Sequence, residues 1–297
     1  MKIQTLSVVV PTSGCVNNCV FCVSKTHSNP YVNMFKETKN SDRIHYKNNL
    51  KRRLQYASLH GVDTIILTGI GEVLQNMDFL HMLNDILTEM NHPFPRIELQ
   101  TSGVLLNDDN ILFLTDINVN TISISVSNLF DNDRNLELID VSPKLRFTIE
   151  NICDRISKFN LNIRLSLNLT SDYNNISPEA YFKKSKSLGA THVTFRKLYS
   201  SANNTPEDKW VNENKLPDSG IEKINNYIKS NGKPLYVLPF GYTAYSVNGI
   251  STVLDDNCMD ISKNADDILK YLILRENGKL FTQWDDEGSL IFWWRLF

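Results

Sequence analysis

Residues 6–22 read Leu-Ser-Val-Val-Val-Pro-Thr-Ser-Gly-Cys-Val-Asn-Asn-Cys-Val-Phe-Cys, a β-branched apolar run followed at once by three cysteines. Such a nearly continuous apolar run predicts a strand buried on both faces, as in a parallel sheet. Cys15, Cys19 and Cys22 have the spacing Cys-x3-Cys-x2-Cys. An iron–sulfur cluster is normally held by four thiolates, so three would leave one iron open for chemistry.

Two other interpretations of these cysteines stay open. Free cysteine is among the most buried residue types, so all three could simply be packed in the interior. Alternatively, Cys15, Cys19, Cys22 and His27 match the Cys3His pattern of a structural zinc site. In that case the protein would be a zinc-stabilised binding or scaffold protein without catalytic activity.

The spacing, with the aromatic Phe21 directly before the third cysteine, resembles the signature of the radical S-adenosylmethionine (radical SAM) superfamily. The resemblance implies a [4Fe–4S] cluster on Cys15, Cys19 and Cys22, with the amino and carboxylate groups of SAM on the fourth iron and Phe21 beside the cofactor. One electron from the reduced cluster would split SAM into methionine and a 5′-deoxyadenosyl radical, which takes a hydrogen atom from the substrate. A reductant such as flavodoxin or ferredoxin is the implied partner.

Beyond the cysteine loop, strand-like and helix-like segments alternate at roughly even spacing. Strands are expected at residues 6–10, 64–68, 97–101, 121–127, 162–169 and 192–197. Because crossovers between parallel strands are right-handed, this rhythm predicts an α/β fold in which the sheet curls into a partial (β/α)6 TIM-type barrel. The radical SAM resemblance implies the same barrel. Among the connecting helices, one is expected to be capped by Asp78 and one to start at Ser142-Pro143, whereas a polar loop is expected through Pro206 and Pro217.

The pattern changes after Leu238, and residues 1–233 are expected to form the barrel domain and residues 234–297 a mixed α+β C-terminal extension. Asn248-Gly249 and Asn277-Gly278 each stand between two strand-like segments, which is a strong hairpin signal. We expect these hairpins to cover the open side of the barrel.

The second predicted strand ends in Gly69-Ile70-Gly71-Glu72, which resembles the family's Gly-Gly-Glu segment that meets the SAM amino group. Ligands of such βα folds gather at the carboxyl ends of the strands, where this segment lies. Glycines let a backbone approach a ligand closely, and a carboxylate or carbonyl accepts from an ammonium group. Ile70 departs from the family's pattern, and an ordinary turn between strand and helix is the alternative.

The same positional rule selects polar residues at the ends of the later strands. The expected SAM contacts are Thr101, Ser102, Ser125, Ser127, Asn168 and Arg196. The resemblance assigns such residues to the ribose and carboxylate of SAM, and an arginine is suited to pair with a carboxylate. Each of them could equally be hydrogen-bonded structure.

Two cysteines lie outside the loop. Cys153 falls on the apolar face of a predicted helix and is expected in the core, whereas Cys258 lies in a polar stretch of the extension. A lone thiol there is either inert or, as in some radical SAM epimerases, a hydrogen-atom donor to a substrate radical. Because two remaining cysteines fall short of four thiolates, a member with a single cluster is expected.

Composition sets the outer bounds on function. Lys plus Arg number 31 and Asp plus Glu 33, which gives a formal net charge of -2 and no global case for nucleic-acid binding. We therefore expect a peptide or small-metabolite substrate. The N-terminal residues have no signal-peptide pattern, no apolar run is long enough to span a bilayer, and five cysteines without a disulfide pattern fit the reducing cytoplasm.

Overall fold

The computed structural model describes residues 2–26, 42–201, 203–238, 242–255, 268–284 and 286–292 of the 297-residue chain. His27 and Cys258 lie outside these residues. The strands are β1 (Lys2–Val9), β2 (Thr64–Thr68), β3 (Arg96–Thr101), β4 (Thr121–Val126), β5 (Asn162–Leu169), β6 (His192–Lys197), β7 (Lys233–Val237), β8 (Thr243–Val247), β9 (Ile250–Asp255), β10 (Ile268–Leu274), β11 (Leu280–Phe281) and β12 (Leu290–Phe292).

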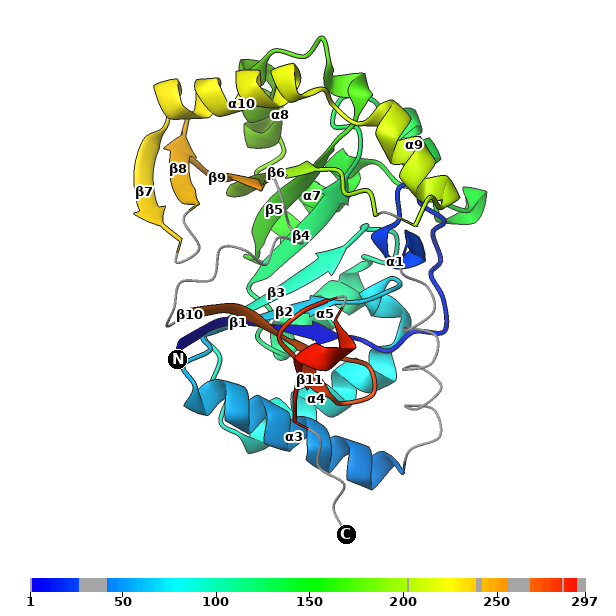
Figure 1. The fold of residues 1–297 in the computed structure, drawn as a ribbon, viewed down its shortest axis with the longest axis vertical. Helices are drawn as coiled ribbons and strands as arrows, with labels where there is room; N and C mark the ends of the chain where they lie inside the picture. The colour runs from blue at the N-terminus through cyan, green and yellow to red at the C-terminus, as the bar shows by residue number, and fades with distance from the viewer. Residues whose placement is uncertain are drawn as a thin grey trace.

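All strands of the described residues belong to one 12-stranded sheet, in the order β12-β11-β10-β1-β2-β3-β4-β5-β6-β9-β8-β7. Strands β1 to β6 are neighbours in chain order and pair in parallel, which confirms the predicted α/β fold and its six βα units. The sheet curves but its two ends do not pair, so the barrel is partial (Figure 1).

Helices cover the outer side of the curved sheet, with α3 and α4 towards one end and α8 and α10 towards the other (Figure 1). The helices are α1 (Val23–Thr26), α3 (Arg43–Leu59), α4 (Met77–Glu89), α5 (Asp108–Asp116), α6 (Asn132–Ile139), α7 (Ile149–Ser157), α8 (Pro178–Ser187), α9 (Pro206–Asn214) and α10 (Asp218–Asn231). None of the described helices is both long and apolar enough to cross a membrane.

Apolar and polar side chains alternate along the central strands, so the sheet has one apolar and one polar face. Leu67 and Leu99 are fully buried in the main hydrophobic core with residues of the helices. Their neighbours Thr68 and Gln100 point the other way and line a cavity on the concave side. Because successive side chains of a strand point to opposite faces, the same strands hold the helices in place and present polar groups to the cavity.

Two helix starts differ from those expected. Helix α4 is capped by Asn76, whose Oδ1 accepts from the amide N of Phe79 at 3.0 Å, so Asp78 lies within the first turn instead of capping it. Helix α7 begins after Thr148, because Pro143–Leu145 form a separate 3-10 turn. The capping side chain precedes the expected one at α4 and follows it at α7, and in both places its oxygen accepts from a free amide of the first turn.

Two short helices were not expected from the sequence. Helix α6 falls where no element was assigned, and α9 falls in the segment expected to be a polar loop. Both are too short and polar for a clear apolar periodicity. Helix α9 does carry one local signal, a capping box in which Thr205 and Asp208 satisfy each other's backbone amides, with Pro206 in its first turn.

The C-terminal strands extend both ends of the sheet. The Asn248-Gly249 turn joins β8 to β9 and the Asn277-Gly278 region joins β10 to β11, and both pairs are antiparallel as predicted. In addition, β9 pairs in parallel with β6 and β10 pairs in parallel with β1, which a local turn signal does not reveal. Strands β7 to β12 thus share a sheet with the barrel strands, and a division into domains at residue 233 stays a prediction.

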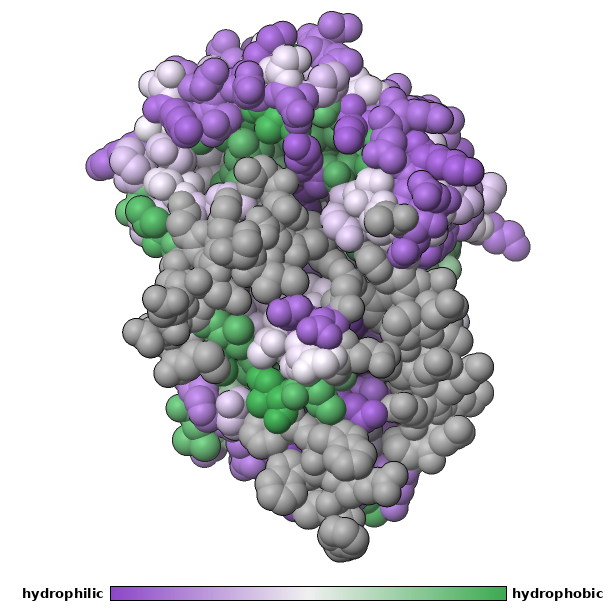
Figure 2. Space-filling model, in the orientation of Figure 1, coloured by the Kyte–Doolittle hydropathy of each residue, from purple (hydrophilic) through white to green (hydrophobic). Residues whose placement is uncertain are grey.

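Strand β7 forms one outer edge of the sheet. Its side chains Leu235, Tyr236 and Val237 are exposed, and Figure 2 shows hydrophobic surface at the left, where β7 lies in Figure 1. Pro234 pairs with Tyr245 and has no amide hydrogen to offer, which weakens the edge as a template for another strand.

Candidate active site

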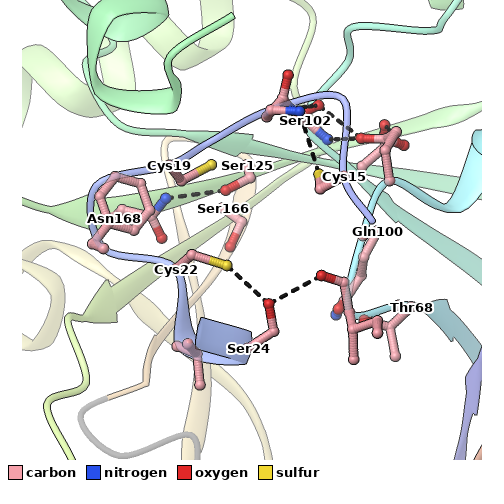
Figure 3. A pocket seen from close by; sticks show the side chains of 18 of the residues that line it. Cys15, Cys19, Cys22, Ser24, Thr68, Gln100, Ser102, Ser125, Ser166 and Asn168 are labelled. Carbon is pink, nitrogen blue, oxygen red and sulfur yellow. Dashed lines mark hydrogen bonds between the residues drawn. The ribbon is translucent and has the colours of Figure 1, made fainter. Parts of the chain in front are cut away.

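The loop after β1 and the carboxyl ends of β2 to β6 enclose a cavity of about 330 Å³. Side chains from the loop and from β2 to β5 point into it (Figure 3), and Arg196 and Lys197 of β6 also line it. The lining residues are Cys15, Asn17, Cys19, Phe21, Cys22, Val23, Ser24, Thr68, Gly69, Ile70, Gly71, Glu72, Gln100, Thr101, Ser102, Ser123, Ser125, Ser166, Asn168, Arg196, Lys197, Leu198 and Tyr199. The cavity therefore brings together all three clustered cysteines and most of the polar residues selected from the sequence.

Backbone hydrogen bonds hold one side of the cysteine loop against the end of α6. The amides of Asn18 and Val20 donate to the carbonyl oxygens of Ile139 and Leu138, each at 3.1 Å. These carbonyls belong to the last turn of the helix, where no partner within the helix is available. The short helix missed in the sequence thus fixes the segment between the cysteines.

Helix α9 holds the other side of the loop. The rings of Phe21 and Trp210 are 5.8 Å apart, and Lys25 forms an ion pair with Glu207 at 3.5 Å. Phe21 was expected beside the cofactor, and it does line the cavity while it also packs on Trp210. An aromatic pair of this kind adds roughly 1 kcal/mol beyond the area it buries, so α9 contributes to the position of the loop.

The three thiols are free and differ in their surroundings. Burial, and then the neighbouring Cys22 and Cys15, raise the pKa of the Cys19 thiol to about 12. Burial also raises the pKa of Cys15, despite a hydrogen bond from the backbone of Asn17. In the protein alone these surroundings disfavour thiolates, and a bound cationic centre would reverse that preference.

The donor set fits an iron–sulfur cluster. Among the described residues no three His, Cys, Asp or Glu side chains converge on one point as ligands of a single metal ion. A cluster does not require such convergence, because each thiolate ligates a different iron. Three soft sulfur donors in one cavity are the ligand type that such clusters take. His27, the fourth ligand of the zinc alternative, lies outside the described residues.

Ser24 links the third cysteine to the turn after β2. Its hydroxyl oxygen lies 2.9 Å from the sulfur of Cys22 and donates to the carbonyl oxygen of Ile70 at 3.0 Å, as Figure 3 shows. Ser24 was not selected from the sequence. Its place two residues after a predicted ligand is the only local signal that could have indicated it.

The turn Gly69-Ile70-Gly71-Glu72 is packed against the protein's own backbone. A Cβ on Gly71 would lie 2.6 Å from the hydroxyl oxygen of Thr12 and closer still to the carbonyl oxygen of Gly14. A Cβ on Gly69 would lie 2.9 Å from the carbonyl oxygen of Gly71. The sequence argument placed these glycines near a ligand, whereas the structure shows that close contact with the start of the cysteine loop already excludes larger residues.

Glu72 is buried, and its carboxylate is held by the end of β3. One oxygen accepts from the hydroxyl of Thr101 at 2.6 Å, and the other accepts from the amide and the hydroxyl of Ser102 at 2.9 and 2.7 Å. Hydrogen bonds to a charged acceptor are about twice as strong as neutral ones. Three predicted residues from two different strands thus form one rigid unit in the cavity wall.

The remaining predicted residues form a second polar group. The Nδ2 of Asn168 donates to the hydroxyl oxygens of Ser125 at 3.0 Å and Ser127 at 3.3 Å. The Nε of Arg196 donates to the hydroxyl of Ser166 at 2.6 Å. Asn168, Ser125 and Arg196 line the cavity, but Ser127 is fully buried behind Asn168 and does not.

Several lining residues were missed in the sequence. Gln100, Ser123 and Ser166 lie deeper in the strands, and the sheet register places Ser123 beside Gln100 and Ser166 beside Ser125. Each lies two residues before a residue that was selected, namely Ser102, Ser125 or Asn168. Because alternate residues of a strand share a face, the selected residues could have indicated them. Cys153 lies on α7 and is buried in the core, as expected.

Known proteins resemble this chain in sequence and in fold. A family model described as the radical SAM superfamily matches residues 9–169. The probable dual-specificity RNA methyltransferase RlmN of Finegoldia magna is 33% identical over 147 residues, which are 48% of this chain and 37% of RlmN.

Solved structures resemble the fold at low sequence identity. Streptococcus suis SuiB bound to precursor peptide SuiA has a TM-score of 0.61 at 14% identity, with coverage of 95% of this chain and 60% of SuiB. Native anSMEcpe with bound AdoMet has a TM-score of 0.53 at 16% identity, with coverage of 76% of this chain and 59% of that protein. This chain thus spans less than two thirds of the relatives named here.

Proposed function

Because the chain belongs to the radical SAM superfamily, we propose that it is an enzyme that reductively cleaves S-adenosylmethionine at a [4Fe–4S] cluster to a 5′-deoxyadenosyl radical. The radical would then abstract a hydrogen atom from a peptide or small-metabolite substrate. One observation carries the proposal: Cys15, Cys19 and Cys22 line the same cavity as the polar carboxyl ends of five successive parallel strands, β2 to β6.

The chain's own residues divide the work as follows. Cys15, Cys19 and Cys22 would hold the cluster, which would supply the electron for cleavage when bound and reduced. The backbone of the Gly69–Glu72 turn and the Glu72 unit face the amino acid end of SAM. Asn168, Ser125 and Arg196 face its carboxylate and ribose.

The substrate class rests on charge and on resemblance. A formal net charge of -2 offers no general attraction for a polyanion, which favours a peptide or small metabolite. SuiB was solved with a precursor peptide and anSMEcpe with the Cp18Cys and Kp18Cys peptides, whereas RlmN is named for RNA. A flavodoxin or ferredoxin is the proposed source of the electron.

Metal analysis separates this proposal from the zinc alternative. Protein prepared without oxygen should contain iron and sulfide and show a brown colour that dithionite bleaches. Alanine at Cys15, Cys19 or Cys22 should abolish both, whereas Cys153→Ala, on α7 outside the cavity, should retain them. One colourless zinc per chain that is lost in His27→Ala would instead favour the scaffold protein.

SAM cleavage is tested by anaerobic incubation of the reconstituted protein with SAM and dithionite, followed by measurement of 5′-deoxyadenosine. Iron that is redox-active but never yields this product would refute the function while leaving the cluster intact. A deuterated cell extract then tests the hydrogen source, because deuterium in 5′-deoxyadenosine identifies a substrate as the donor.

Cys258 is proposed as a hydrogen-atom donor to the substrate radical. Its thiol lies outside the described residues, so the proposal rests on the sequence alone. A Cys258→Ala variant should still release 5′-deoxyadenosine but stall before product. Unchanged product formation in that variant would rule the role out.

A further inference from the structure

Asn17 stands between the first two cysteines in the cavity wall, and its side chain has an acceptor with no partner among the residues that the structure describes. Only 7% of the residue is exposed, and it lines the cavity. Its Nδ2 donates to the hydroxyl oxygen of Ser102 at 2.8 Å, whereas its Oδ1 is buried and has no hydrogen-bond partner among the described residues. A buried polar atom without a partner costs about 1–3 kcal/mol, so it calls for an explanation.

The orientation of the amide follows from the charge of Glu72. An ionised carboxylate can only accept hydrogen bonds, so the hydroxyl of Ser102 donates its single hydrogen to Glu72. The oxygen of Ser102 is then left to accept, and it accepts from the Nδ2 of Asn17. The carbonyl oxygen Oδ1 is therefore the end of Asn17 that remains available to a ligand.

The missing partner must be a hydrogen-bond donor. The carboxylate of Glu72 already accepts hydrogen bonds from Thr101 and Ser102. Its influence on a ligand is therefore indirect, through the hydrogen bonds that link it to Ser102 and Ser102 to Asn17. We propose that Oδ1 of Asn17 accepts a hydrogen bond from the amino group of SAM and that Glu72 is the positioning residue that orients this amide. This inference rests on the proposed function. It adds a contact between SAM and the cysteine loop to the contacts proposed for the Gly69–Glu72 turn.

The test compares ligands with and without the amino group. Equilibrium binding of SAM, of decarboxylated SAM, and of the SAM analogue with hydrogen in place of the amino group is measured on the anaerobically reconstituted protein. Asn17→Ala should weaken SAM and decarboxylated SAM about tenfold, the value of one hydrogen bond of about 1.4 kcal/mol. It should leave the affinity for the analogue without the amino group unchanged.

Asn18→Ala is the matched control. Asn18 is the next residue of the same loop, is exposed, and bonds Asp140 at 2.8 Å and Lys25 at 2.5 Å outside the cavity lining. The affinities of the Asn18→Ala protein for all three ligands should equal those of the wild type. Iron content and the cluster absorbance, measured for each variant, establish that the loop still holds the cluster.

Ser102→Ala provides a second variant, which leaves the sequence of the cysteine loop unchanged and removes the hydroxyl that accepts from Asn17. Without the hydroxyl the amide of Asn17 is no longer oriented, so affinity for SAM should fall severalfold while the analogue without the amino group is unaffected. If Asn17→Ala fails to take up iron, the affinities of the Ser102→Ala protein for SAM and for the analogue test the inference in its place.

Two results would overturn the inference. One is an equal loss of affinity for all three ligands, which would make Asn17 a merely structural residue. The other is wild-type affinity for SAM in both Asn17→Ala and Ser102→Ala. Wild-type protein that carries the cluster but binds no SAM would instead refute the proposed function itself, and the inference with it.

Discussion

Replacement of Gly71 by alanine tests how the cysteine loop is positioned. The added Cβ would lie 2.6 Å from the hydroxyl oxygen of Thr12, 3.0 Å from the carbonyl carbon of Gly14 and closer still to its oxygen. Two of these neighbours are backbone atoms, which cannot rotate away as the end of a side chain can. The start of the cysteine loop must therefore shift, or the turn after β2 must.

The expected cost follows from that crowding. Insertion of an extra methyl group into a well-packed site costs about 1–3 kcal/mol, and rigid backbone neighbours place Gly71→Ala in the upper part of this range. Alanine also restricts the backbone of the unfolded chain more than glycine does, which raises the free energy of unfolding by about 0.4–1 kcal/mol. The net free energy of unfolding should therefore fall by roughly 2 kcal/mol.

Gly14→Ala is the matched control, because a Cβ at Gly14 would meet nothing within 4 Å. Without crowding, only the gain of about 0.4–1 kcal/mol from the unfolded chain should remain. Urea unfolding of the metal-free proteins, followed by circular dichroism, measures the difference between the two variants. Iron uptake after anaerobic reconstitution should also be lower in Gly71→Ala. Equal unfolding midpoints and equal iron uptake in the two variants would refute this account of the loop.

Three further predictions follow from single side chains. Burial alone would raise the pKa of Asp208, but hydrogen bonds from Ser201 and Thr205 outweigh it and lower the pKa from 3.8 to about 2. This carboxylate thus stabilises the fold fully above about pH 4 and loses that effect as the pH falls through about 2. Asp208→Asn should therefore cost roughly 2 kcal/mol at pH 7 and progressively less as the pH is lowered to 2 and below, as pH-dependent unfolding would show. Glu72→Gln should destabilise the metal-free protein by about 2 kcal/mol in thermal unfolding, because the new amide NH2 meets hydrogen-bond donors, and an unchanged midpoint would contradict the hydrogen-bonded unit at β3. Ser24→Ala should make the cluster potential more negative by roughly 20–60 mV in a redox titration. A ligating Cys22 thiolate can only accept, so we expect the hydroxyl hydrogen of Ser24 to turn from the carbonyl oxygen of Ile70 to this sulfur when the cluster is bound. An unchanged potential would show that the hydrogen stays on Ile70.

The strands of the barrel were predictable because their signal is local. Residues 162–169 and 192–197 were expected as strands, and β5 and β6 occupy these positions. Runs of apolar and alternating residues report burial of one or both faces, which depends little on what the partner strand is. The parallel pairing of β9 and β10 with the barrel was not predictable, because it joins segments far apart in the chain.

Short polar helices were the main gap in the predicted fold, and they matter for the site. Helix α6 presents the carbonyl oxygens of Leu138 and Ile139 to the cysteine loop, and α9 presents Trp210 to Phe21. Neither helix has an apolar stripe long enough to be recognised, since each makes its key contacts through its end or through one large side chain.

The sequence by itself determined the ligand type and the scaffold: three clustered cysteines after a buried strand, and six βα units that bring the polar strand ends to one side. Spacing and alternation suffice for this, because they are properties of neighbouring residues. Only the tertiary structure decided which polar groups are available to a ligand. It showed Ser127 behind Asn168, the carboxylate of Glu72 engaged by β3, and Oδ1 of Asn17 without a partner in the part of the chain that the structure describes. These outcomes depend on hydrogen bonds between segments far apart in the chain, where each donor and each acceptor can be used only once.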